Sequence, residues 1–296
     1  RSSDLHTSLC ATPIYTYGTD AQKEKYLKPL ASGEQLGAFA LTEPVAGTDA
    51  SMQKSTAVLE GDHYVLNGSK IFITNAGFAD VYIVFAMTDK SKGTKGISAF
   101  ILEKDFPGFS VGTHEVKMGI RGSSTCELFF DNCIVPKENL LGEEGRGFNI
   151  AMATLDGGRI GVAAQALGIA EGAIEETIKY VNERVQFGRT ISKFQNTQFE
   201  LAQMRANTEA AKLLVYQAAC AKDNHERFTH FAAMAKLVAS RNASDVTRRC
   251  LQLFGGYGYS SDYPIERMMR DAKITEIYEG TSEVQMMVIA GWMGVK

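Results

Sequence analysis

The spacing of apolar residues changes along the chain and predicts three regions. Residues 1–35 carry short apolar clusters at helical spacing. Residues 36–137 carry short runs of β-branched and aromatic residues, separated by Gly, Asp and Lys, which are typical of strands. Residues 138–296 return to helical spacing over long stretches. We therefore expect a multi-domain α and β protein with a helical segment, a β domain and a C-terminal helical bundle.

The boundaries inside the first two regions follow from capping and turn residues. Asp20 is expected to cap a short helix that stops at Pro29 and Gly33. Asn67-Gly68 lies between two β-prone runs and predicts a hairpin turn. Further strands are expected at Val81–Met87, Gly96–Leu102 and Cys126–Phe130. Consecutive strands with no helix between them favour an antiparallel sandwich or barrel over a doubly wound parallel sheet.

Long helices are expected after Pro136 and Gly142. The first should bury Ile160, Ala164, Leu167, Ile174, Ile178 and Val181, and the second Leu201, Met204, Ala211, Val215 and Ala218. The third should bury Met234, Val238, Val246, Cys250 and Leu253, and end at Gly255-Gly256. Amphipathic helices joined by short links predict a four-helix-type bundle.

Composition narrows the class of protein. The chain has 296 residues, of which 45% are hydrophobic and 22% charged, and its net charge is −3, so nothing indicates a nucleic-acid partner. No apolar run is long enough to span a membrane. Five scattered cysteines without Cys-x-x-Cys spacing indicate free thiols in a reducing compartment.

One segment near the C-terminus suggests acid–base chemistry. In Ile277-Tyr278-Glu279-Gly280-Thr281-Ser282-Glu283, a carboxylate lies between apolar residues and a glycine. Partial desolvation raises the pKa of a carboxylate, as a base needs when it removes a weakly acidic C–H proton. Taken alone, the segment could equally be a helix start with Thr281 as N-cap and Glu283 in the first turn.

Other loops carry weaker signals, each with an ordinary structural reading. Phe39–Asp49 offers hydroxyls and backbone donors, but most loops of this kind are turns. Phe72 and Thr74 should share one strand face, which a half-buried strand would also explain. Arg184 near a helix end could simply complement the helix dipole.

Asp156 and Arg159 stand three residues apart on an expected helix and could form a surface ion pair. The glycines at positions 157, 158 and 161 need another explanation, because each costs a helix about 1 kcal/mol relative to alanine. They indicate that something approaches the backbone closely.

Two other classes of site are excluded by their context. Gly256-x-Gly258 follows a helix and Gly145-x-Gly147 has no βαβ frame, so neither is a dinucleotide site. A di-iron bundle needs paired Glu-x-x-His motifs on helices, and the single copy, Glu60–His63, lies in a turn. The histidines form no ligand cluster, so no metal site is expected.

Together and in this order, the motifs resemble the acyl-CoA dehydrogenase family, and within it the short-chain, butyryl-CoA dehydrogenases. The stretches that carry the resemblance are Leu41-Thr-Glu-Pro44 with Gly47-Thr-Asp49, Phe72-Ile-Thr74, Leu155-Asp-Gly-Gly-Arg159, Arg184-x-x-Phe-Gly188, Gln252-x-x-Gly-Gly256-Tyr-Gly-Tyr259 and Ile277–Glu283. The resemblance spans about residues 9–291. It implies that residues 1–35 are the remnant of an N-terminal helical domain that is otherwise missing.

The resemblance implies FAD as cofactor. The residues that match cofactor-binding positions are Leu41, Thr42, Phe72, Ile73, Thr74, Arg184, Phe187, Gln195, Gln252, Gly255, Gly256, Thr281 and Glu283. Among these, the pyrophosphate and adenosine would be served, partly from a neighbouring subunit of a homotetramer, by Arg184, Gln195, Gln252, Gly255 and Gly256. The residues that match acyl-CoA-binding positions are Thr48, Asp156, Arg159, Tyr278 and Gly280. The family often has Ser where Thr48 stands, and the hydroxyl is retained.

The implied reaction is α,β-dehydrogenation of a short-chain acyl-CoA to a trans-2-enoyl-CoA. Glu279 would take the α-proton while the β-hydride passes to flavin N5. Electrons would go to an electron-transferring flavoprotein. An acyl-CoA oxidase, an enoyl-CoA reductase and a non-catalytic family member remain as alternatives. The lack of a presequence favours the bacterial cytoplasm over the mitochondrial matrix.

Overall fold

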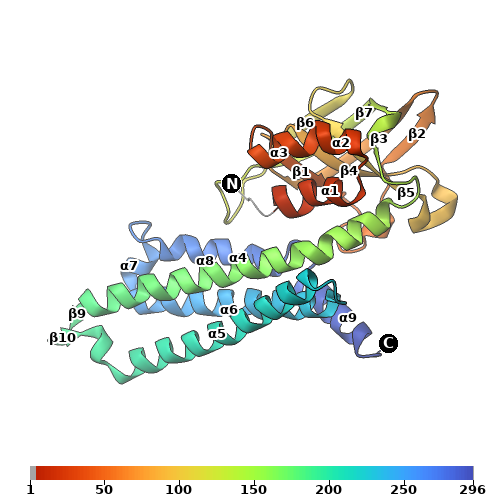
Figure 1. Cartoon of the computed structure of the whole chain (residues 1–296). Helices are drawn as coiled ribbons and strands as arrows, with labels where there is room; N and C mark the ends of the chain where they lie inside the picture. Colours follow the sequence, from red (N-terminus) through yellow and green to blue (C-terminus); the bar gives the residue numbers. More distant parts are fainter. Residues whose placement is uncertain (1–4, 296) are drawn as a thin grey trace. The chain divides into compact units, whose positions relative to one another are not determined.

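The computed structural model describes residues 5–295, which form two compact units (Figure 1). The first comprises residues up to 117 together with 121–158, and the second comprises 118–120 with 159 onwards. The short N-terminal helices belong to the first unit, beside the sheet, and the long helices form most of the second.

The N-terminal segment is helical, as expected. Its elements are η1 (Leu5–Ala11), α1 (Thr12–Tyr17), α2 (Asp20–Gln22), η2 (Lys23–Leu27) and α3 (Lys28–Ser32). The N-cap of α2 is Thr19 rather than Asp20, because Thr19 and Gln22 form a reciprocal capping box. Pro29 lies in the first turn of α3, where its missing N–H costs nothing, and Gly33 ends that helix at φ 80°.

The β region forms one sheet whose order is β6-β7-β3-β2-β4-β5-β8, with β1 paired to β4. The strands are β1 (Gly37–Ala40), β2 (Thr56–Glu60), β3 (His63–Thr74), β4 (Val81–Met87), β5 (Ile97–Glu103), β6 (Phe109–His114), β7 (Thr125–Pro136) and β8 (Leu140–Leu141). Short 3₁₀ helices η3 (Ala50–Met52), η4 (Lys90–Gly96) and η5 (Lys137–Asn139) connect them. Most pairs are antiparallel, but β1 and β2 pair with β4 in parallel, so the sheet is mixed, and it is open rather than a closed barrel.

The hairpin predicted at Asn67-Gly68 is wrong. Strand β3 runs straight through both residues, and the turn from β2 lies at Gly61-Asp62 instead. Gly68 marks a register shift between β3 and β7, and a Cβ there would lie 2.3 Å from the Ser55 hydroxyl oxygen. The glycine therefore serves a β-bulge and a close backbone approach rather than a turn.

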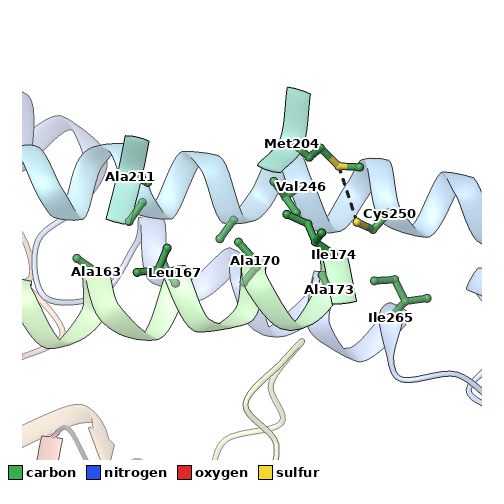
Figure 2. Packing of buried hydrophobic residues seen from close by; sticks show 14 of the residues in the cluster. Ala163, Leu167, Ala170, Ala173, Ile174, Met204, Ala211, Val246, Cys250 and Ile265 are labelled. Atoms are coloured by element: carbon green, nitrogen blue, oxygen red, sulfur yellow. Dashed lines mark hydrogen bonds between the residues drawn. The ribbon is translucent and has the colours of Figure 1, made fainter. Parts of the chain in front are cut away.

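The helical unit is built from α4 (Gly147–Glu183), α5 (Gln195–Asp223) and α6 (Thr229–Phe254). Shorter elements are β9 (Val185–Gln186), β10 (Arg189–Thr190), η6 (Ile191–Lys193), α7 (Gly256–Tyr259), α8 (Ile265–Lys273), η7 (Ile274–Glu276) and α9 (Ser282–Trp292). Figure 2 shows the core where Met204 of α5 and Cys250 of α6 meet across 3.8 Å between their sulfur atoms. Small residues dominate this core, which lets the helices approach closely.

The expected helical stripes are correct in part. The stripe on α5 is confirmed, since Met204, Ala211, Val215 and Ala218 are buried. On α4, however, Ala164 is exposed and Ile178 is 40% exposed, and on α6 Val238 is 37% exposed. Many of the buried positions on these two helices are occupied by alanines. They include Ala163, Ala166, Ala170 and Ala173 on α4 and Ala232, Ala235, Ala239 and Ala243 on α6.

Candidate active site

Glu279 lies between η7 and α9, and we call residues 275–280 the Glu279 segment. The backbone of Glu279 has a conformation that few residues adopt. Its φ is 53°, and that of Gly280 is 89°. Two consecutive left-handed residues turn the chain sharply, and the first of them carries a Cβ, which makes the conformation costly. Such strain persists only when surrounding contacts hold the segment.

Three side chains supply those contacts. Lys236 Nζ donates to the carbonyl oxygens of Thr275 at 2.9 Å and Gly280 at 2.8 Å. Ser240 Oγ donates to the same Thr275 oxygen at 2.9 Å, and Gln285 Nε2 to the same Gly280 oxygen at 2.8 Å. Both carbonyls that flank the Glu279 segment thus receive two donors each.

The Lys236 ammonium is buried, with 1% of the residue exposed. Burial lowers the pKa of Lys236 to about 8; the charge of Arg159 lowers it as well, while the charges of Glu279 and Glu276 oppose the shift. Glu276 in turn accepts hydrogen bonds from Ser244 and, at 2.9 Å, from Lys273. The segment therefore combines two carboxylates with a buried cation.

The residues next to Glu279 have defined roles in the fold. The Tyr278 hydroxyl donates to Gln165 Oε1 on α4. Thr281 is the N-cap of α9, with its hydroxyl oxygen 3.4 Å from the Val284 nitrogen. Glu283 is exposed in the first turn of α9. The helix-start reading of Thr281 and Glu283 is thus confirmed, and Glu279 lies just outside that helix.

Asp156 and Arg159 both lie on α4, as their spacing predicts. Arg159 is only 7% exposed, so the reading as an ordinary surface ion pair does not fit this residue. A buried guanidinium is stabilised by hydrogen-bonding partners or an anionic neighbour, so this position carries a positive charge inside the fold.

In the first unit, the expected flavin-facing residues come from two adjoining segments. The Ile71 nitrogen donates to the Thr42 carbonyl at 3.0 Å, which joins the Leu41–Thr42 segment to β3. The pairing of β3 with β7 shifts register between Lys70 and Ile73. In this bulge Phe72 has φ 56° and is 60% exposed, while its neighbour Ile73 is buried. The bulge turns an aromatic ring outward, beside the half-buried Thr74.

A buried ion pair fixes the same two segments. Lys70 Nζ lies 2.8 Å from Glu43 Oε1 and also donates to the Leu41 carbonyl at 3.1 Å and to Gln53 Oε1 at 3.0 Å. Glu43 accepts further bonds from the backbone nitrogens of Lys54 and Ser55. Thr48, by contrast, lies in the exposed part of the loop that follows.

A second group of expected cofactor residues meets at the far ends of the long helices. Arg184 follows α4 and stacks its guanidinium over the Tyr257 ring, 5.0 Å from the centroid. Phe187 and Gly188, both with positive φ, form the turn between β9 and β10, and Phe187 is 93% exposed. Gln195 opens α5, and Gln252 lies near the end of α6; both are exposed. A Cβ added at Gly255 or Gly256 would meet no atom within 4 Å, so the backbone there is open.

The helical unit does not bring this second group to Glu279. Arg159 and Glu183 are separated by about 36 Å along α4, given the 1.5 Å rise per residue. Lys236, which binds the Glu279 segment, and Gln252 are separated by about 24 Å along α6. Within one copy of the chain, the two groups form two separate sites.

Comparison with known proteins decides the family. The N-terminal, middle and C-terminal domain models of acyl-CoA dehydrogenase match residues 2–34, 38–133 and 145–294. The chain belongs to the acyl-CoA dehydrogenase family. The curated relatives include a short-chain specific acyl-CoA dehydrogenase of Clostridium acetobutylicum, 64% identical over 286 residues, which cover 97% of this chain and 76% of that protein. This assignment supports the expectation of an FAD-dependent enzyme.

Two further relatives bear on the reaction. The solved structure of butyryl-CoA dehydrogenase from Megasphaera elsdenii matches with a TM-score of 0.97 and 61% identity, covering 99% of this chain and 76% of that one. The CarC subunit of a caffeyl-CoA reductase-Etf complex from Acetobacterium woodii is 50% identical over 286 residues, covering 97% of this chain and 76% of that protein. The family thus includes both dehydrogenases and reductases.

Within residues 5–295, no group of three or more His, Cys, Asp and Glu side chains is arranged to hold a metal ion. The same stretch contains no helix long and apolar enough to cross a membrane.

Sequence reasoning missed the side chains that support the site. Lys236, Gln285 and Gln165 contact the Glu279 segment, and Glu43 and Lys70 support the Phe72 bulge. A signal for Lys236 was available, because it shares the face of α6 that carries Ala232, Ala239 and Ala243. A charged residue on a stripe of small core residues must have buried partners.

Proposed function

We propose that this enzyme removes two hydrogens from a short-chain acyl-CoA, giving a trans-2-enoyl-CoA, with Glu279 as the base. The observation that carries the proposal is the conformation of Glu279, strained and held by four hydrogen bonds from Lys236, Ser240 and Gln285 to its flanking carbonyls. A fixed carboxylate beside a glycine can present its oxygen to a substrate without reorganising.

The residues present fit FAD. The exposed Phe72 ring and the adjacent Thr74 and Thr42 offer an aromatic face and hydroxyls for a planar heterocycle. Arg184 supplies a cation suited to a pyrophosphate, and the open backbone at Gly255 and Gly256 permits a close approach. FAD, when bound, supplies the acceptor for the β-hydride.

The two groups of cofactor residues suggest how copies of the chain cooperate. Because Arg184 and Gln252 lie tens of ångströms along the helices from the Glu279 segment, we infer that they bind the adenosine end of FAD held by a neighbouring copy. A homotetramer, as expected for the family, would provide such neighbours.

The roles of the chain in the reaction follow from its side chains. A Glu279 oxygen would take the α-proton of the thioester, and the electron pair of that C–H bond would form the C=C bond. FAD, when bound, would supply the acceptor for the β-hydride, so the substrate would be oxidised by two electrons and the flavin reduced. Polarisation of the thioester carbonyl by backbone N–H groups would make the α-proton more acidic. Tyr278, Gly280, Thr48, Asp156 and Arg159 would contact acyl-CoA; Arg159 offers a buried positive charge.

An anaerobic absorption spectrum tests the proposal. The FAD-loaded enzyme should lose its flavin band on addition of butyryl-CoA, with formation of trans-crotonyl-CoA, and lose it more slowly with palmitoyl-CoA. A band that palmitoyl-CoA bleaches and butyryl-CoA does not would refute the short-chain substrate. Bleaching by neither would refute acyl-CoA dehydrogenation.

A second candidate is the reverse reaction, reduction of an enoyl-CoA. The similarity to CarC, named as part of a reductase-Etf complex, favours it and also favours an electron-transferring flavoprotein as partner. The dithionite-reduced enzyme should then be reoxidised by crotonyl-CoA much faster than butyryl-CoA reduces the oxidised enzyme. Comparable rates would leave dehydrogenation as the proposed direction.

A further inference from the structure

The two ends of the Glu279 segment are joined by a buried cation, the ammonium of Lys236. Lys236 projects from the N-terminal half of α6. Its ammonium donates to the carbonyl of Thr275, at the start of the Glu279 segment, and to the carbonyl of Gly280, at its end. An ammonium group has three donors, so one side chain can bind both carbonyls at once. Lys236 therefore bridges the two ends of the segment.

Two neutral side chains duplicate the hydrogen bonds but not the charge. Ser240 shares the Thr275 carbonyl with Lys236, and Gln285 shares the Gly280 carbonyl. If one hydrogen bond per carbonyl were enough, Ser240 and Gln285 would suffice without Lys236. Placing an ammonium in the core instead carries a desolvation cost, which is offset only by acceptors and nearby negative charge.

Lys236 has charged neighbours of both signs. Glu279 and Glu276 attract it, and Arg159 repels it. The attraction is reciprocal, so the ammonium favours the ionised form of the Glu279 carboxylate. Lys236 can thus act on the base in two ways, through the backbone and through its charge.

We propose that Lys236 is a positioning residue for the base, fixing the Thr275–Gly280 backbone so that Glu279 points to the substrate and keeping its carboxylate ionised. The proposal rests on the proposed role of Glu279. It assigns Lys236 no contact with substrate or cofactor. Proton abstraction should depend on Lys236 more strongly than substrate binding does.

The test compares Lys236→Met and Lys236→Gln with Ser240→Ala, each loaded with FAD. Lys236→Met removes the charge and both donors, Lys236→Gln keeps a donor, and Ser240→Ala removes one bond to the same Thr275 carbonyl while the charge stays. With Lys236→Met we expect the rate of flavin reduction by butyryl-CoA to fall at least about tenfold, with KM changed much less. The acidic limb of the kcat/KM profile should move to higher pH in both Lys236 variants and stay in place in Ser240→Ala.

Two outcomes would overturn the proposal. One is a Lys236→Met or Lys236→Gln enzyme with the rate and pH profile of the wild type. The other is loss of FAD and fold in both, which would make Lys236 a purely structural residue. Glu279→Gln, measured in parallel, separates the two claims: if it still reduces its flavin, the assigned base is wrong whatever Lys236 does. If Lys236 acts through Glu279, the double variant should be no slower than Glu279→Gln.

Discussion

Lys70 and Glu43 form an ion pair, 2.8 Å between Nζ and Oε1, in which neither side chain is more than 3% exposed. The pair joins the segment of Leu41 and Thr42 to the strand that bulges at Phe72. The Leu41-Thr-Glu-Pro44 and Phe72-Ile-Thr74 motifs are thus joined by a contact between Glu43, inside the first motif, and Lys70, two residues before the second.

Lys70→Met should destabilise the first unit, which contains the sheet, by about 3–5 kcal/mol, because it leaves the Glu43 carboxylate buried without its cation. Urea unfolding, followed by far-ultraviolet circular dichroism, measures the change. Lys104→Met is a matched control: Lys104 also pairs with a carboxylate, Asp80 at 2.7 Å, but its side chain is 53% exposed. That variant should lose about 1 kcal/mol or less, and equal losses in the two would contradict the role given to the buried pair.

Acid should weaken the same contact. Burial alone would raise the pKa of Glu43, but the charge and hydrogen bond of Lys70 and the backbone donors together lower it below its usual 4.5. A carboxylate with a lowered folded-state pKa adds stability above pH 4.5 that is lost as the pH falls through the lowered value. Glu43→Gln should therefore be less stable than the wild type at neutral pH but lose less stability on acidification below pH 4.5, measured as the shift in urea midpoint. A parallel decline in both proteins would show that Glu43 contributes nothing to acid sensitivity.

Gly280→Ala should harm both stability and turnover. The glycine has φ 89°, and an added Cβ would lie 2.8 Å from Gln285 Nε2 and 3.2 Å from Val284 Cγ1. We expect a loss of about 1–3 kcal/mol and a larger loss of activity, since Gln285 holds the Glu279 segment. Gly291→Ala on α9 meets no atom within 4 Å and should be neutral or stabilising by thermal unfolding. An active, stable Gly280→Ala enzyme would argue against a tightly fixed segment.

Arg184→Ala should weaken FAD binding without affecting proton abstraction by Glu279. The guanidinium stacks on Tyr257 at the helix ends far from the Glu279 segment, so the variant should need about tenfold or more FAD for saturation. Flavin fluorescence on dialysis measures this, and turnover at saturating FAD should be restored. Arg248→Ala, an exposed α6 residue paired with Asp245, is the control. Unchanged FAD retention in Arg184→Ala would refute its assignment to the cofactor.

The order of the elements could be predicted from sequence because it depends on local pattern, whereas the role of Glu279 stays a prediction. The change from β-prone runs to long helical spacing lies near the true boundary, and the motif around Glu279 is contiguous. The hairpin predicted at Asn67-Gly68 is wrong because a glycine can serve a bulge as well as a turn, and only the pairing with a distant strand decides between them.

Which face of α4 and of α6 is buried could not be predicted from the large apolar residues alone. Ile178 and Val238 are accessible, whereas alanines fill the close contacts between helices. The residues that support the site could be predicted only in part. The place of Lys236 on the alanine-lined face of α6 indicates that it is buried. Its partners and those of Gln285 are backbone carbonyls, which carry no side-chain signal in the sequence.

The most direct test of the account is anaerobic stopped-flow reduction of FAD-loaded wild-type and Glu279→Gln enzymes by butyryl-CoA. Glutamine keeps the shape of the side chain but cannot accept the α-proton as a carboxylate does. We expect Glu279→Gln to retain FAD and bind butyryl-CoA, with flavin reduction slowed by about 10²–10⁴-fold or more. Reduction within about tenfold of the wild-type rate would contradict Glu279 as the base.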